Sequence, residues 1–341
     1  MKRRATIVQV AERAGVAFST VSRVMNGGYA SQEVRQRVER AARDLGYTPS
    51  SIARNLKMGR QGCIGVVTMT SQGSWFTQVL GGIEEALEER TVSALLGSLR
   101  LRGRYDASTV ARWIRERRVD GLVFTRCTPS EKGLIAGAAK AKIPMVFVAP
   151  DENFGGGPIF ETDNRRGALE LGRHLLRLGH RRIGFLGGPR ASVDTRERLR
   201  GLREALAEAR LTLDRGHVAY AESYAPDAGI PYAQQWLAWP TSRRPTAVMC
   251  GNDALALGFM RTVLQAGVRV PGGVSVTGFD GVPESGLYWP GLTTVKQPSH
   301  ELGMSACKLL LRMIEGGPLD PAMRVELPAR VILRESTARA P

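Results

Sequence analysis

The chain has 341 residues, a net charge of +16 and a hydrophobic content of 43%. A single core rarely grows past about 250–300 residues, so we expect more than one folded unit. No apolar run reaches the roughly 18 residues of a membrane-spanning helix, and no apolar segment follows the basic start, so we expect a cytoplasmic protein. The cysteines are far apart and form no zinc or redox motif; they are Cys63, Cys127, Cys250 and Cys307.

The positive charge is concentrated at the start of the chain. Residues 1–60 carry twelve Lys/Arg against four Asp/Glu, which is half of the net charge in under a fifth of the sequence. A compact basic segment is typical of a surface that neutralises nucleic-acid phosphates. A general preference for arginine throughout the chain is the alternative, and charge alone does not separate the two.

Residues 6–46 predict three short helices. Thr6 and Gln9 form a capping-box pattern, and apolar residues then recur at helical spacing until Gly15. A second helix is expected over 18–25 and a third over 32–45, which Gly46 ends.

The first two helices, joined by a tight glycine turn, predict a helix-turn-helix whose second helix enters the major groove of DNA. Phe18, Ser19 and Arg23 are the outward positions suited to base edges, since arginine can donate two bonds to guanine and phenylalanine can pack on a thymine methyl. The alternative is an ordinary helical hairpin with solvated polar side chains. The expected DNA contacts are Thr6, Phe18, Ser19, Thr20, Ser22, Arg23 and Asn26.

Residues 49–61 predict a hinge between domains. The stretch 52–57 has the composition of a helix but is too short to be stable alone in water. A plain interdomain linker is the alternative to a helix that folds on binding.

From residue 63 onward short apolar strands alternate with amphipathic helices, which predicts two α/β lobes in series, each with a parallel sheet. Ligands of such sheets bind beyond the carboxyl ends of the strands. The expected strands are 64–69, 94–99, 121–124, 144–148, 182–186, 218–221, 247–250 and 274–278, and the expected helices are 79–89, 107–117, 134–141, 164–178, 195–209, 231–238 and 254–266.

The start of the chain resembles the headpiece of the LacI/GalR family of bacterial repressors. The matching motifs are Ala14-Gly15-Val16, Thr20-Val21-Ser22-Arg23-Val24-Met25-Asn26, residues 34–38 and residues 45–50. Ala17 departs from the pattern, because the family usually has a serine there that caps the recognition helix, and losing that cap costs about 1 kcal/mol.

The resemblance implies a homodimer on a pseudo-palindromic operator and a hinge helix that folds on that DNA. Leu56 would be the wedge that opens the minor groove, and the expected minor-groove residues are Ala53, Arg54, Leu56 and Lys57.

The resemblance continues through the α/β lobes, at residues 179–188, 196–202, 250–253, 274–280 and 290–298. It implies a fold like that of periplasmic binding proteins, with Arg198, Asn252 and Asp280 as effector contacts, a set that suits a hydroxyl-rich ligand. Trp75 and Phe76 could stack on a sugar face or be core residues. We expect a sugar or sugar derivative, with a purine as the alternative; Ala149, where sugar-responsive relatives often carry a polar residue, leaves the class open.

These features together predict an α/β regulator with a helical headpiece at 1–48, a hinge at 49–61 and a bilobal effector-binding and dimerisation domain at 62–341. We expect lobes at about 62–162 and 163–292, with the last segment crossing back between them. A solute-binding protein would need a signal segment and no headpiece. An enzyme is the other alternative, but HExxH, GxSxG and P-loop motifs are absent, so we expect no catalytic residue, metal or cofactor.

Overall fold

The computed structural model describes residues 5–25, 27–48, 59–69, 73–88, 90–101, 104–318 and 320–341. The chain divides into two compact units, Met1–Gly62 and Cys63–Pro341. The predicted hinge contacts Ala53, Arg54, Leu56 and Lys57, together with Asn26, lie outside the described residues.

The first unit contains the three predicted helices, α1 (Ile7–Ala14), α2 (Phe18–Met25) and α3 (Gln32–Leu45). The predicted capping box is confirmed, because the Thr6 side chain accepts from the Gln9 amide and the Gln9 side chain accepts from the Thr6 amide. Gly15 ends α1 with a φ of 64°, a left-handed conformation that suits glycine. The helices enclose a small core of Val10, Ala11, Ala14, Val21, Val24, Val38, Ala41 and Ala42.

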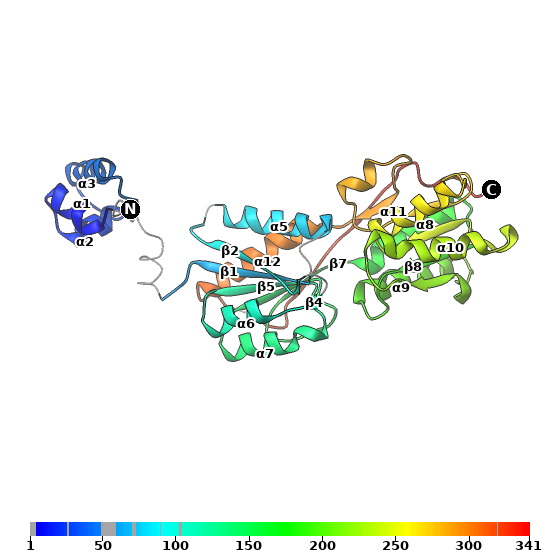
Figure 1. The fold of residues 1–341 in the computed structure, drawn as a ribbon, viewed down its shortest axis with the longest axis horizontal. Helices are drawn as coiled ribbons and strands as arrows, with labels where there is room; N and C mark the ends of the chain where they lie inside the picture. Colours follow the sequence, from blue (N-terminus) through cyan, green and yellow to red (C-terminus); the bar gives the residue numbers. More distant parts are fainter. Residues whose placement is uncertain are drawn as a thin grey trace. The chain divides into compact units, whose positions relative to one another are not determined.

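The second unit has two lobes, each built on a parallel sheet. The N-lobe sheet has six strands in the order β13-β7-β6-β5-β1-β2. Helices α5 and α12 cover one face and helices α6 and α7 cover the other, and Figure 1 shows α12 lying beside α5. The strands are β1 (Cys63–Thr68), β2 (Ser93–Ser98), β5 (Gly121–Thr125), β6 (Met145–Val148), β7 (Ile159–Thr162) and β13 (Arg324–Leu327), and the helices are α5 (Ser74–Leu87), α6 (Ser108–Arg115), α7 (Lys132–Lys140) and α12 (Ser299–Ile314).

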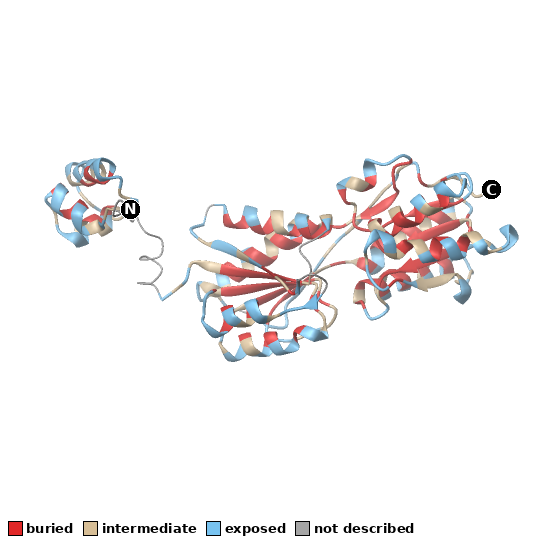
Figure 2. Ribbon diagram, viewed as in Figure 1, coloured by how far each residue is buried: buried red, intermediate tan, exposed pale blue. Residues whose placement is uncertain are grey.

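The C-lobe sheet has four parallel strands in the order β11-β10-β8-β9. Helices α8 and α9 pack on one face and helices α10 and α11 on the other, so the central strands of both sheets are buried between layers of helices (Figure 2). The strands are β8 (Ile183–Gly187), β9 (Val218–Tyr220), β10 (Ala247–Cys250) and β11 (Ser275–Thr277), and the helices are α8 (Asn164–Arg177), α9 (Val193–Glu208), α10 (Ile230–Ala238) and α11 (Asp253–Gln265).

The chain passes between the lobes three times. It leaves the N-lobe after β7, returns after β12 (Thr294–Lys296) to form α12 and β13, and then runs back into β14 (Arg330–Ile332), which pairs with β12. The final residues are held in the C-lobe, where His180 Nε2 lies 3.0 Å from the Ala338 carbonyl and the Val276 amide donates to the Ser336 carbonyl at 2.9 Å. Residues near the C-terminus therefore complete both lobes.

Most predicted helices and strands agree with the structure to within a few residues, but helix α5 begins five residues earlier than the sequence pattern placed it. Trp75 and Phe76 consequently lie in its first turn. Strands β7, β12, β13 and β14 and helix α12 were not predicted as elements, and neither was the small hairpin of β3 (Arg100–Leu101) and β4 (Arg104–Tyr105).

Glycines let α5 and α12 approach closely. A Cβ atom on Gly82 would lie 1.9 Å from the carbonyl oxygen of His300, and one on Gly303 would lie 2.0 Å from that of Val79. No larger residue fits without separating the two helices, so this contact fixes where the returning chain is placed on the N-lobe.

Candidate DNA-binding and effector sites

Helix α2 presents two different faces. Val21 and Val24 are buried in the core of the headpiece, while Phe18 keeps 55% of its surface and Ser19 and Arg23 are exposed. Ser19 and Arg23 are four residues apart and therefore share a face of the helix. The three side chains predicted to read bases are thus on the solvent side of one short helix.

The other predicted DNA contacts in the headpiece are more enclosed. Thr20 and Ser22 are half-buried, and Thr6 is exposed at the start of α1, where its side chain also caps the helix. Tyr29, which the sequence did not indicate as a contact, is 89% exposed just after α2. Its position beside the predicted reading helix adds it to the candidates.

Two of the basic residues of the headpiece brace its backbone. Arg37 Nη2 donates to the carbonyl of Ala14 at 2.6 Å and to that of Gly15 at 3.0 Å, and Arg35 Nη2 donates to the carbonyl of Gly28 at 3.0 Å. These bonds hold α3 against the turns on either side of α2. Part of the charge concentrated in the first 60 residues therefore serves the fold.

A group of charged and aromatic residues meets where the carboxyl ends of the strands of both lobes face each other. We call it the interlobe cluster; it consists of Trp75, Arg126, Asp194, Arg198, Tyr224 and Asp280. It contains Trp75, Arg198 and Asp280, which the sequence predicted as effector contacts, and Arg126, Asp194 and Tyr224, which it did not.

Arg198, on α9, is the most enclosed member, with only 1% of its surface exposed. Its guanidinium donates to Asn164 Oδ1 at 2.8 Å and to the Gly251 carbonyl at 2.5 Å, and it lies 3.9 Å above the ring of Phe279. Nη2 is 3.5 Å from the carboxylate of Asp194. These contacts tie α8, α9 and the ends of β10 and β11 together.

Asp280 follows β11, and its carboxylate is 4.0 Å from Arg198 Nη1. It accepts a bond of 2.6 Å from Gln297 Nε2. Burial raises the pKa of Asp280 above its ordinary value, and Arg198 and Arg126 oppose that rise. Burial also raises the pKa of the neighbouring Asp253, as does the charge of Asp280.

Asn252 has its amide committed to the backbone. Its side-chain oxygen accepts from the Leu255 amide at 2.9 Å, which caps α11, and its nitrogen donates to the Tyr224 carbonyl at 3.2 Å. It adjoins the interlobe cluster through Gly251, whose carbonyl binds Arg198. The structure thus brings Arg198 and Asp280 together and places Asn252 beside them.

The two predicted aromatic contacts differ in their surroundings. Phe76 is 5% exposed and packs in the core between α5 and the N-lobe sheet. Trp75 is 7% exposed and packs in the same core, and its ring also lies 5.2 Å from the guanidinium carbon of Arg126. Of the pair, Trp75 is the one that adjoins the interlobe cluster.

Arg126 connects the two lobes. It follows β5 of the N-lobe, and its Nη1 lies 2.8 Å from a carboxylate oxygen of Asp194 on α9 of the C-lobe. Asp151, after β6, adds a second link by accepting from the Val193 amide at 3.2 Å. The sequence signal for Arg126 was its position two residues after a predicted strand, 121–124, because ligand-facing residues of such sheets lie just beyond the strand ends.

Asp194 lies between two guanidinium groups. Burial alone raises its pKa, but Arg126 and Arg198 outweigh that effect, and bonds from Arg126 and Asn164 add to theirs, so the pKa is lowered on balance. The ionised carboxylate is therefore the stable form in the folded protein at neutral pH.

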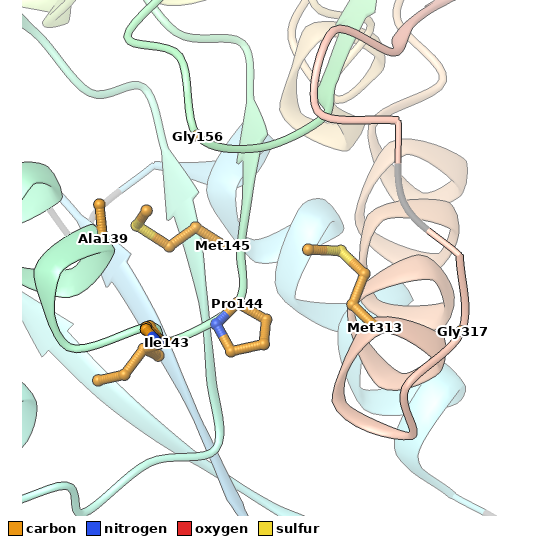
Figure 3. A pocket seen from close by; sticks show the side chains of 8 residues that line it. Ala139, Ile143, Pro144, Met145, Gly156, Met313 and Gly317 are labelled. Atoms are coloured by element: carbon orange, nitrogen blue, oxygen red, sulfur yellow. The ribbon is translucent and has the colours of Figure 1, made fainter.

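A separate hollow of about 330 Å³ lies in the N-lobe between the start of β6 and the end of α12 (Figure 3). Met145 and Met313 face each other across it. The predicted effector residues do not line it; its lining consists of Ala139, Lys142, Ile143, Pro144, Met145, Gly156, Met313 and Gly317.

Among the residues that the structure describes, no three His, Cys, Asp or Glu side chains gather in a way that could hold a metal ion. None of the helices in the described part of the chain is long and apolar enough to span a membrane.

A helix-turn-helix domain followed by a two-lobed α/β domain with polar residues between its lobes is the architecture of a DNA-binding regulator with a small-molecule sensor. Residues 6–50 match the family described as bacterial regulatory proteins, lacI family, and residues 173–337 match the periplasmic binding protein-like domain. The chain is 32% identical to the HTH-type transcriptional repressor PurR of Escherichia coli O139:H28 over 340 residues, 99% of this chain and 98% of that protein. It belongs to the LacI family of bacterial transcription regulators.

Solved structures agree with this assignment. The chain is similar to the Lac repressor dimer bound to operator and the anti-inducer ONPF, with a TM-score of 0.83 and 27% identity over 98% of this chain and 100% of that one. It is also similar to the transcriptional regulator CelR in complex with cellobiose, with a TM-score of 0.73 and 28% identity over the same shares of the two chains. The predicted family, fold class and regulatory function are confirmed.

The electrostatics of the interlobe cluster predict that stability depends on Asp194 in a pH-dependent way. Because the pKa of Asp194 is lowered in the folded state, its charge stabilises the protein above the ordinary aspartate pKa of about 4, and this contribution is lost as the pH falls through the lowered value. Asp194→Asn should lower the free energy of unfolding by about 3 kcal/mol at pH 7, since it removes the carboxylate closest to Arg126 and next to Arg198, and by less at pH 3, below the ordinary aspartate pKa. Urea denaturation at both pH values measures the difference.

Asp280→Asn is the matched control. Its pKa is raised, so its charge contributes less to stability at neutral pH, and an asparagine oxygen can still accept from Gln297. We expect a smaller loss than for Asp194→Asn at pH 7. Equal losses for the two variants, or a loss at Asp194 that is the same at both pH values, would contradict this account.

Proposed function

We propose that this chain is a cytoplasmic homodimeric repressor without enzymatic activity, which binds a pseudo-palindromic operator and responds to a small molecule held between the lobes of its sensor domain. The relatives support the regulatory role, because those named above are transcription regulators. The main structural support for DNA binding is the exposed face of α2, where Phe18, Ser19 and Arg23 point away from the core of the headpiece.

We propose that the exposed face of α2 contacts the DNA bases and that residues around it contact the DNA phosphates. Arg23 is long enough to bond guanine, and Phe18 presents an apolar ring to a thymine methyl. Thr6, Thr20, Ser22 and Asn26 are the proposed phosphate contacts. The proposed minor-groove contacts are Ala53, Arg54, Leu56 and Lys57, with Leu56 as the wedge.

Dimerisation is supported by an apolar surface on the C-lobe. Leu287, Tyr288 and Trp289 follow one another after the short 3-10 helix Pro283–Gly286, and they are 80%, 59% and 82% exposed. Large apolar side chains gathered at one exposed place are typical of interaction sites. A second copy of the chain is the proposed partner, because the similar Lac repressor binds its operator as a dimer.

The effector that we propose is a neutral, hydroxyl-rich molecule such as a sugar. Asp280 and Arg198 can accept from and donate to hydroxyl groups, and similar regulators have been solved with cellobiose and with ribose. A purine base is the alternative that one observation favours, since Trp75 and Tyr224 offer two ring faces for a planar ligand.

The reading face of α2 predicts a loss of sequence specificity in Arg23→Ala. Losing a two-bond contact to a base should reduce the preference for operator over random DNA by about tenfold to a hundredfold. The operator is first selected from a random pool with the wild-type protein, and both affinities are then measured at several salt concentrations. Arg40→Ala removes an exposed charge from α3 instead and should leave the preference unchanged. An unaltered preference in Arg23→Ala would show that Arg23 does not read bases.

The exposed C-lobe surface predicts that Trp289→Asp weakens the dimer. A charge placed in an apolar contact would have to be buried on association, whereas the monomer can hold it in water. Sedimentation at micromolar concentration, without DNA, should show monomers for this variant and dimers for the wild type. Tyr29→Asp, an exposed aromatic of the headpiece, is the control and should stay dimeric. A dimeric Trp289→Asp would place the interface elsewhere.

A ligand screen tests the sensor. Sugars, sugar acids and purine bases are compared for their effect on the melting temperature of the whole protein, and operator binding is repeated with each compound that raises it. We expect at least one sugar or purine to change operator affinity by fivefold or more, because an effector acts through its different affinities for two states. Asp280→Ala should abolish the response to that compound. Compounds that bind without any effect on operator affinity would argue against a sensor.

A further inference from the structure

Arg126 is enclosed by groups that are suited to bind a flat cation. Its guanidinium carbon lies 5.2 Å from the centre of the Trp75 ring and 4.9 Å from that of the Tyr224 ring. Its Nη1 is 2.8 Å from the carboxylate of Asp194, and 28% of the side chain remains exposed. Two aromatic rings within cation–π distance and one carboxylate are the elements from which proteins build receptors for guanidinium and ammonium groups.

The position of Tyr224 is itself held by bonds. Its hydroxyl lies 2.8 Å from Thr195 Oγ1 and donates to Ser192 Oγ at 3.1 Å. Trp75 is fixed by its packing in the N-lobe core, and Asp194 by a bond from Asn164. We call the space between Trp75, Tyr224 and Asp194 the guanidinium slot. Its walls have supports of their own and do not depend on Arg126 alone.

Arg126, by contrast, enters the slot from an unusual backbone conformation. Its φ is 49°, in the left-handed region that residues other than glycine rarely adopt. Arg198 has its own partners in Asn164 and Gly251, so the core of the C-lobe does not need a second guanidinium.

We propose that Arg126 is an internal occupant of the effector site, which fills the guanidinium slot when no effector is bound and must leave it when the effector binds. This rests on the proposed function, in which the interlobe cluster holds the effector. The lobes are then joined in the empty state by the Arg126–Asp194 pair, and binding exchanges that link for contacts to the ligand.

The slot constrains the chemical class of the effector. When Arg126 leaves, the buried carboxylate of Asp194 loses its closest cation, and a buried unpaired carboxylate is strongly disfavoured. The incoming molecule must therefore bring O–H or N–H donors, or a positive charge, with a flat face for the two rings. Anionic ligands such as sugar phosphates and sugar acids are disfavoured by the carboxylates of Asp194, Asp151 and Asp280.

The ligand also needs acceptor atoms. Among the described residues, Trp75 Nε1 is a buried nitrogen without a hydrogen-bond acceptor, and Arg198 Nη2 has no acceptor beyond its 3.5 Å ion pair with Asp194. A hydroxyl group both donates and accepts, so a neutral polyol or a cationic sugar-like molecule meets both requirements.

The slot can be tested without knowing the effector, by emptying it and refilling it. Arg126→Ala removes the occupant, and methylguanidinium chloride is the probe. We expect the melting temperature of this variant to rise with millimolar probe, by about 3 °C at ten times the dissociation constant and with the logarithm of probe concentration beyond it, at constant ionic strength set with NaCl. The wild type should show no such rise, because its slot is already filled.

Arg126→Gly is the second variant, since glycine accepts the positive φ and keeps the backbone unstrained. Arg200→Ala is the matched control, because it removes an exposed arginine of α9 from its pair with Glu197 without opening an enclosed space. Stabilisation by the probe of Arg126→Ala or Arg126→Gly, and of neither the wild type nor Arg200→Ala, supports the proposal. Equal responses in the wild type or in Arg200→Ala, or no response in either Arg126 variant, overturn it.

This result is independent of the ligand screen. If the probe binds the emptied slot but no compound alters operator affinity, the guanidinium slot exists but has no regulatory role. If a compound alters operator affinity but the probe does not bind the emptied slot, the sensor function is supported and the proposed role of Arg126 is wrong.

Discussion

The sensor domain depends on one buried charge, the guanidinium of Arg198. It is almost free of solvent, and it is stabilised there by an amide oxygen, a backbone carbonyl, a phenylalanine ring and the nearby carboxylates. A charge in such a place is stable only while these partners stay in position. The ends of β10 and β11 and the starts of α8 and α9 are therefore held in one arrangement, and the ligand-facing edge of the C-lobe is built around it.

The second guanidinium of the interlobe cluster has the opposite character. Arg126 is partly exposed, comes from the other lobe and has its strongest contact across the interface. A fixed charge on one lobe and a displaceable one on the other give the two lobes a contact that can be broken without disturbing either core. Such a pair suits a protein whose two states differ in how the lobes meet.

The sequence predicted what local patterns and family motifs encode. Capping by Thr6, the end of α1 at Gly15 and the alternation of strands and helices follow from short-range chemistry, and Arg198 and Asp280 lie in motifs that resemble the family's. The surroundings of Arg126 could not be predicted in this way, because Asp194 and Tyr224 are brought to it only by the folding of both lobes. Likewise β13, with its alternation of exposed and half-buried residues, becomes a strand through pairing with β7.

The three passages of the chain between the lobes have a consequence for synthesis. The N-lobe sheet is completed by β13 at Arg324–Leu327, and one of its faces is covered by α12, so this lobe cannot finish folding until the chain as far as residue 327 has left the ribosome. Contacts between residues so distant in sequence form slowly, and a strand awaiting its neighbour exposes an unpaired edge. We therefore expect the edge of β7 to stay open in the nascent protein until β13 emerges, an interval in which chaperones can protect it.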